Sequence, residues 1–178
     1  SHMTGTYTPA TTGMHNLTIY NHRQDDHQDL LQNYIDDITL VPLTTDFTSS
    51  NLQFSASQPN QVAQFNLNAG PSWAGWKYIV LLSRSGNWPG VTSGGVWLPL
   101  KVDPITHKSI SLANGSRLPH SKATLNASGA AMAGLVFPAP MGANWVGREL
   151  NVAYILYQGP GYKPFSYASM PVTILFIP

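Results

Sequence analysis

The chain of 178 residues is long enough for one ordinary domain, or for one domain and part of another. Apolar residues make up 43% of it and charged residues only 10%, so a core can form beneath a weakly charged surface of polar residues. The lack of cysteine excludes disulfides, thiol catalysis and cysteine-ligated zinc, and no apolar run approaches the roughly 20 residues of a membrane helix. This composition is typical of extracellular bacterial β-proteins.

Charge is unevenly distributed, although the net charge is only +1. Residues 1–46 hold six aspartates against Arg23 alone, whereas residues 47–178 hold eight lysines and arginines against Asp103 and Glu149. The basic residues occur singly, and nucleic-acid binding usually needs a clustered basic face. We therefore expect no nucleic-acid partner.

The first part of the chain contains two predicted strands. Ser1-His2-Met3 is typical of the remnant of an affinity tag, and we exclude it. Alternating apolar residues predict strands at 15–20 and 34–42, with a polar, acidic loop between them. Residues 43–50 are expected to be a connection, which divides the chain into a segment 4–46 and a module 47–178.

Short strands are predicted at regular intervals within 47–178, separated by turns rich in Gly, Pro and Asn. They are 52–56, 62–67, 78–83, 96–100, 109–112, 122–127, 131–137, 150–157 and 172–177. This spacing predicts an all-β fold with little helix, an antiparallel β-sandwich of the jelly-roll or immunoglobulin-like kind.

The stretch 123–138 is interpreted as the central hairpin of the module. Leu125 alternates with polar neighbours, Ser128-Gly129 supplies the turn, and residues 131–137 continue as an apolar arm. The apolar side chains expected in the core are Leu125, Met132, Leu135 and Phe137.

Two parts of the chain resemble known families. The motifs His15-Asn16-Leu17-Thr18-Ile19 and Tyr34-Ile35-Asp36-Asp37-Ile38-Thr39-Leu40 resemble the closing strands of galactose-binding-like jelly rolls, the fold of many carbohydrate-binding modules. Residues 47–178 resemble a C-terminal β-sandwich module of large secreted bacterial proteins, through motifs such as Asn66-Leu67-Asn68-Ala69-Gly70 and Val146-Gly147-Arg148-Glu149-Leu150. The second resemblance implies a secreted or cell-surface location and other domains on a longer parent chain, but no particular activity.

Catalytic motifs are largely absent from the sequence. It contains no Gly-x-Ser-x-Gly elbow, no metalloprotease motif, and no phosphate-cradling or dinucleotide-binding loop. Outside the acidic segment the only carboxylates are Asp103, which is expected to begin a turn, and Glu149. We therefore predict that the module is not an enzyme, and a hydrolase with an unrecognised site is the alternative.

Asp36 and Asp37 are the candidate metal ligands. Adjacent strand residues point to opposite faces, so one of the two is expected to be solvated and the other buried. In the jelly rolls that this segment resembles, an acid near this place helps to hold a structural calcium ion, which needs six to eight oxygen ligands. A hydrogen-bonded structural acid is the alternative, and no other cofactor is expected.

Aromatic residues near loops are the strongest indication of function. Sugars present apolar C–H faces that stack on exposed rings, while amide side chains bond their hydroxyls. Trp88 and Tyr162 lie among Gly and Pro, where a ring is hard to bury, and Asn87 adjoins Trp88. These three are the candidate ligand-binding residues; for Trp88 the alternative is that it covers the edge of the sandwich.

Other tryptophans are expected to have structural roles. Trp97, between Val96 and Leu98, is expected in the core, and Trp73 and Trp76 are expected to cover an end of the sandwich. The sequence thus indicates a non-catalytic extracellular module with a structural or adhesive role, whose partner is polysaccharide or another surface component. A carbohydrate-binding module of a polysaccharide-degrading enzyme is the main alternative.

Overall fold

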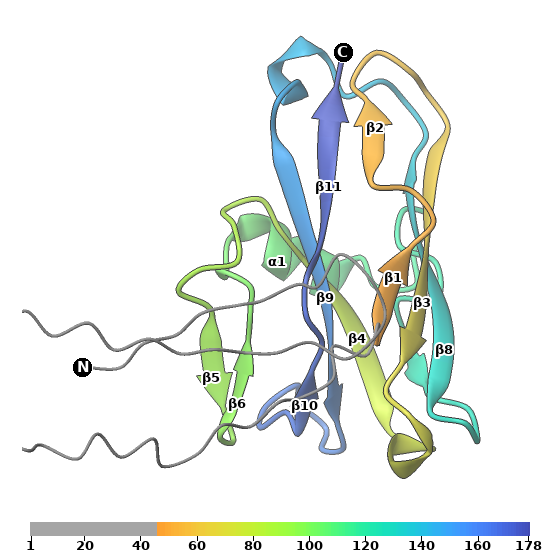
Figure 1. Ribbon diagram of the computed structural model, residues 1–178, viewed down its shortest axis with the longest axis vertical. Helices are drawn as coiled ribbons and strands as arrows, with labels where there is room; N and C mark the ends of the chain where they lie inside the picture. Colours follow the sequence, from red (N-terminus) through yellow and green to blue (C-terminus); the bar gives the residue numbers. More distant parts are fainter. Residues whose placement is uncertain (1–45) are drawn as a thin grey trace, which may run out of the picture. The chain divides into compact units, whose positions relative to one another are not determined.

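Two β-sheets face each other in residues 46–178, the part of the chain that the computed structural model describes (Figure 1). The smaller, sheet A, is antiparallel with the order β1-β3-β8, which are Phe47–Ser49, Gln61–Asn68 and Ala130–Phe137. Sheet B has the order β2-β11-β9-β4-β7, which are Gln53–Ser55, Val172–Ile177, Glu149–Tyr157, Lys77–Ser83 and Lys122–Thr124. The short strand β10 (Tyr167–Ala168) pairs with β9.

Additional elements lie outside the two sheets. They are the hairpin β5–β6 (Val91–Ser93 and Val96–Leu98), the helix α1 (Pro104–Ser111), and the 3₁₀ turns η1 (Pro71–Trp73) and η2 (Ala143–Trp145). In the described residues α1 is the only α-helix, and it is far too short to cross a bilayer. The predicted all-β sandwich with little helix is confirmed.

The strand order is that of an immunoglobulin-like sandwich. The chain runs through β1 in sheet A and then crosses to sheet B, where β2 pairs in parallel with β11; every other pairing in the described residues is antiparallel. β1 occupies residues that the sequence indicated as a connection. That expectation was wrong because β1 is only three residues long, too short to show an apolar period, whereas β2 lies within the strand predicted at 52–56.

The core between the sheets follows from the alternation of β3. Its residues Ala63, Phe65 and Leu67 are buried, while the residues between them face solvent. Phe65 lies opposite Ala133 of β8, and Ala63 lies opposite Leu135, so large and small side chains alternate across the pair. Burial of a side chain such as Phe65 contributes about 1.5–3 kcal/mol to folding.

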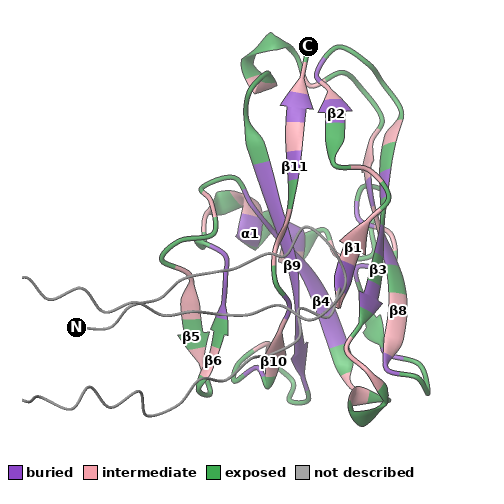
Figure 2. Cartoon of the chain, in the orientation of Figure 1, coloured by how far each residue is buried: buried purple, intermediate pink, exposed green. Residues whose placement is uncertain are grey.

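The centre of sheet B, strands β4 and β9, is buried on both faces. One face meets sheet A, and the other carries Ile79 and Leu81 of β4 with Ala153 and Ile155 of β9. This second face is covered by the β5–β6 hairpin, by the segment around Phe165, and by α1, which lie on the side of β4 and β9 away from β3 and β8 (Figure 1). β4 and β9 are therefore buried almost throughout (Figure 2), and their residues are mostly apolar without alternation.

Helix α1 replaces the strand expected at 109–112. Asp103 is its N-cap, Thr106 completes a capping box, and Pro104 occupies the first turn. The inward face buries Thr106 and Ser109 rather than large apolar residues, and the Ser109 hydroxyl accepts a hydrogen bond from the Leu82 N–H of β4. The predicted strand was wrong because the buried face of the helix is polar, so the sequence shows no apolar residues at helical spacing.

The stretch 123–138 is not a hairpin, because its two arms belong to different sheets. β7 pairs with β4 in sheet B, whereas β8 pairs with β3 in sheet A, and the turn between them bridges the sandwich. Leu125 and Leu135 are buried and Phe137 is partly buried, as expected, but Met132 is 58% exposed. Met132 was wrongly placed in the core, since the alternation of β8 directs it to the outer face.

Amide side chains protect the two edges of sheet B. The Asn114 side chain donates to the Lys122 carbonyl (2.7 Å) and accepts from the Lys122 N–H (3.0 Å), which imitates a neighbouring strand beside β7. Gln61 pairs in the same way with the N–H and C=O of Ser55 in β2. Both contacts occupy backbone groups that would otherwise offer an edge to another chain.

Gly129 is the residue on which the crossing from β7 to β8 depends. It has φ +73°, and a β-carbon there would overlap the Gly70 carbonyl oxygen. We predict that Gly129→Ala destabilises the fold by about 4 kcal/mol or more, since backbone rather than a side chain must move. Gly147 is the matched control, with φ +75° and no atom within 4 Å of such a carbon. Gly147→Ala should cost only the backbone strain, about 1–2 kcal/mol, and equal losses in urea unfolding would contradict the prediction.

Candidate functional site

The β5–β6 hairpin carries an exposed tryptophan, Trp97. Val91 pairs with Leu98, and Leu98 and Val96 pack on the outer face of sheet B. Trp97 lies between them on the strand and so points the other way, with 43% of its surface exposed. The expectation that Trp97 is a core residue was wrong, because a two-stranded hairpin has only one covered face.

Trp88 lies in the loop before β5 and is 74% exposed. Its ring centroid is 6.3 Å from that of Trp97, in an edge-on arrangement. The Trp97 indole nitrogen donates to the Pro89 carbonyl (2.9 Å), and a β-carbon at Gly90 would overlap the same indole. Trp97 therefore fixes the backbone that follows Trp88 and leaves the Trp88 indole open to solvent.

Asp103 fixes the other end of the same loop. Its side chain accepts hydrogen bonds from the backbone N–H groups of Arg84 (2.8 Å) and Ser85 (3.0 Å), and of Thr106 in α1 (2.9 Å). Partial burial on its own raises the pKa of Asp103, but these hydrogen bonds outweigh it and hold the pKa below the ordinary 3.8. One carboxylate thus ties the end of β4, the start of α1 and the loop of Trp88 together.

Asn87 and Tyr162 differ in their relation to Trp88. Asn87 is exposed beside Trp88 in the same loop. Tyr162 lies between β9 and β10, in a loop that meets the opposite end of the hairpin, where a β-carbon at Gly94 would lie 3.0 Å from Pro164. The structure therefore places Asn87 and Trp88 together, and it places Tyr162 in a different surface region.

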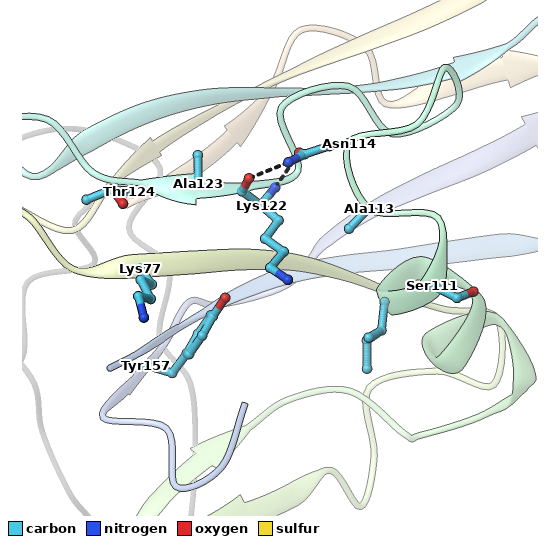
Figure 3. Close-up of a pocket in the computed structure, with 9 residues that line it drawn as sticks. Lys77, Ser111, Ala113, Asn114, Lys122, Ala123, Thr124 and Tyr157 are labelled. Atoms are coloured by element: carbon cyan, nitrogen blue, oxygen red, sulfur yellow. Dashed lines mark hydrogen bonds between the residues drawn. The ribbon is translucent and has the colours of Figure 1, made fainter. Parts of the chain in front are cut away.

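A pocket with a volume of about 490 Å³ lies between β7 and the end of α1 (Figure 3). Tyr162 contacts one of its lining residues, Lys122. The Lys122 ammonium donates to the Tyr162 hydroxyl (3.1 Å), and the Tyr162 ring packs edge-on against Tyr157. We call this the lysine pocket; its lining residues are Lys77, Ile110, Ser111, Ala113, Asn114, Lys122, Ala123, Thr124 and Tyr157. It holds two lysines and no carboxylate among its described lining residues.

The surroundings of Lys122 in the lysine pocket favour its protonated, positively charged form. The hydrogen bond with the Tyr162 hydroxyl raises the pKa of Lys122 above its ordinary 10.5. Burial raises the pKa of Tyr157, so its hydroxyl is neutral at physiological pH. Sequence reasoning missed Lys77, Lys122 and Tyr157, because only the register of β7, β4 and β9 brings them together.

A partly buried aspartate–tyrosine pair lies at an end of the sandwich. The Tyr167 hydroxyl donates to the Asp46 carboxylate, and the Tyr154 hydroxyl donates to the Asp46 carbonyl (3.3 Å). Trp73 packs on Tyr167 and on Trp76, so these two tryptophans partly cover the core. Burial raises the pKa of Asp46, and burial with the Asp46 hydrogen bond raises that of Tyr167.

The candidate metal ligands Asp36 and Asp37 lie outside the described residues, as do the expected strands at 15–20 and 34–42. Within residues 46–178 no group of three or more His, Cys, Asp or Glu side chains could hold a metal ion. The calcium site therefore stays a prediction, and so does the division into 4–46 and 47–178.

Comparison with known proteins adds no relative to this description. No protein-family model matches the chain, and no curated protein matches it. Residues 46–178 thus form an all-β fold, and the chain matches no recognised catalytic family. The resemblances to a galactose-binding-like jelly roll and to a secreted β-sandwich module stay predictions.

Removal of the Asp103 carboxylate should loosen α1 and the Trp88 loop together. We predict that Asp103→Ala lowers the free energy of unfolding by about 1–2 kcal/mol, the usual cost of a lost N-cap. It should also speed hydrogen exchange at the Arg84 and Ser85 amides, which lose their acceptor. Because the pKa of Asp103 is depressed in the folded state, its stabilisation is present above the ordinary 3.8 and is lost as the pH falls further. A difference between wild type and variant that does not shrink in acid would contradict this role.

Buried tyrosines should limit stability at alkaline pH. The folded-state pKa values of Tyr154 and Tyr167 are raised above the ordinary 10.0, chiefly by burial. Their stabilising contribution is therefore complete below pH 10 and declines as the pH rises above it. We expect the free energy of unfolding, measured in urea from pH 8 to 11, to fall less steeply in Tyr167→Phe than in wild type. Identical slopes would show that Tyr167 ionises as readily when folded as when unfolded.

Proposed function

We propose that this protein is a non-catalytic extracellular accessory module that binds carbohydrate by stacking a sugar on Trp88. The observation that carries the proposal is the 74% exposed indole of Trp88 on a loop whose two ends are fixed. An exposed indole in water is stabilised when the apolar face of a sugar ring covers it. Because Trp97 and Asp103 already hold the loop, little conformational entropy is lost on binding.

Asn87 supports the same proposal. It is exposed next to Trp88, and its amide can both donate to and accept from sugar hydroxyls. The loop thus presents an apolar ring and a polar amide side by side, which is the combination that sugars require.

The hydrogen bonds of Asp103 support a binding role rather than a catalytic one. Both carboxylate oxygens of Asp103 accept hydrogen bonds, which cap α1 and anchor the loop. Paired-carboxylate hydrolysis needs two carboxyl groups facing one sugar, and Asp103 is fully committed to structure. A role beside a polysaccharide-degrading enzyme differs from a role in a surface adhesin only in the neighbouring domains of the parent chain.

Substitution of Trp88 tests the proposal directly. Wild type should be retained by one or more polysaccharides in insoluble-polysaccharide pull-downs and on a glycan array, and Trp88→Ala should bind at least tenfold more weakly, which corresponds to about 1.4 kcal/mol of lost stacking. Trp88→Phe should retain part of the affinity.

Met132→Ala is the matched control, since Met132 is also largely exposed but lies on the outer face of sheet A. It should bind like wild type, and thermal melting should show all variants folded. Wild type that binds no glycan, or Trp88→Ala that binds as well as wild type, would refute the proposal.

A further inference from the structure

We propose that the lysine pocket is a second ligand site, which binds the oxyanion of an acidic sugar unit, a carboxylate or a sulfate. This inference is independent of Trp88, because no described contact joins the lysine pocket to the Trp88 loop. Its basis is a pair of ammonium groups, held in place on one face of sheet B, in a concavity of suitable size.

Strand register places the two lysines on the same face of sheet B. Lys77 pairs with Thr124, and Ile79 pairs with Lys122, so Lys77 and Lys122 are diagonal neighbours on the same face of the β4–β7 pair. Long side chains at diagonal positions are within reach of each other. No described carboxylate lines the pocket, so an oxyanion would be the first anionic partner of the two lysines there.

Each ammonium is held by one contact and keeps donors for a ligand. The Lys122 ammonium donates to the Tyr162 hydroxyl (3.1 Å), and the Lys77 ammonium donates to the Gln158 carbonyl (3.3 Å). An ammonium has three N–H donors, so two remain on each lysine. The Asn114 amide fixes the backbone of Lys122 at the same time, and Figure 3 shows this amide paired with Lys122 at the rim of the pocket.

The other walls suit a sugar ring better than a bare ion. The volume of about 490 Å³ lies within the range of small-molecule sites. Tyr157 of β9 pairs with Lys77, and its ring forms a buried wall, while Ser111 and Thr124 add hydroxyl groups. Ile110 of α1 adds an apolar side chain to the lining. The pocket therefore combines cationic, hydroxyl and apolar groups around one concavity.

Nucleic acid is a poorer match for this site. Binding to a phosphate backbone depends on many cations that follow the strand, whereas this pocket offers two. The remaining lysines and arginines of residues 47–178 occur singly along the sequence. An acidic sugar unit needs only one oxyanion contact with a ring beside it.

Calorimetric titration of the whole chain tests the site. The probes are oligogalacturonate, an uncharged galactose oligomer of the same length, a sulfated galactose oligomer and inorganic phosphate. We expect the acidic oligomers to bind and the uncharged one not to bind, with affinity that falls as salt is added. Binding of galacturonate alone identifies a carboxylate ligand, and binding of the sulfated oligomer alone identifies a sulfate ligand.

Charge-matched variants locate the binding. Lys77→Gln and Lys122→Gln should each weaken binding about tenfold, and the double variant should abolish it. Lys101→Gln removes the same charge from an exposed lysine that does not line the pocket, and it should change affinity less than twofold. Trp88→Ala should leave this binding unchanged, so failure here is distinguishable from failure of the stacking proposal.

Several outcomes would overturn the inference. They are binding of no acidic oligomer, equal binding of the uncharged oligomer, and an equal loss in Lys101→Gln, which would show nonspecific attraction. Binding of inorganic phosphate as tight as that of the acidic oligomers, or tighter binding of a single-stranded oligonucleotide, would likewise exclude a sugar site.

Discussion

The antiparallel pairing of β4 with β9 is the contact on which the rest of the structure depends. It runs from Lys77 opposite Tyr157 to Ser83 opposite Asn151, and nearly every residue along it is buried. Strands buried on both faces need a cover on each side. Sheet A supplies one cover, and the β5–β6 hairpin with α1 supplies the other. This second cover carries the Trp88 loop, and its helix α1 forms one wall of the lysine pocket.

Both proposed sites adjoin this second cover, and each has a fixed support. The Trp88 loop is fixed by the Asp103 carboxylate at one end and the Trp97 indole at the other. The lysine pocket is bordered by α1 and by β7, whose free edge the Asn114 amide occupies. Side chains on pre-arranged loops lose little entropy when a ligand binds, so even small contacts contribute to affinity.

Two kinds of polar contact stabilise the fold without forming a site. The amides of Asn114 and Gln61 act as substitutes for strands at the edges of sheet B, which limits association through those edges. Asp46 and Tyr167 satisfy each other in a partly buried place at the end of the sandwich. Such groups are conspicuous in a structure, but their hydrogen bonds are already made, and nothing about them calls for a ligand.

Local sequence determined a large part of this description. Alternation in β3 and continuous apolar runs in β4 and β9 were visible in the sequence, because side-chain period follows directly from burial on one face or two. The exposure of Trp88 was also foreseeable, since a large ring in a loop of Gly and Pro is hard to bury. The composition excluded disulfides outright, because no cysteine is present.

Tertiary structure alone decided the remainder. Whether 123–138 formed a hairpin or crossed between sheets depended on which distant strand each arm paired with, and both pairings satisfy the same local pattern. Trp97 faces solvent because its strand ended up in a two-stranded hairpin covered on one side. Lys77, Lys122 and Tyr157 are separated along the chain by tens of residues, and only strand register makes them neighbours. Local sequence therefore indicated most of the strands and the exposure of Trp88, whereas long-range pairing decided the exposure of Trp97 and which side chains share a site.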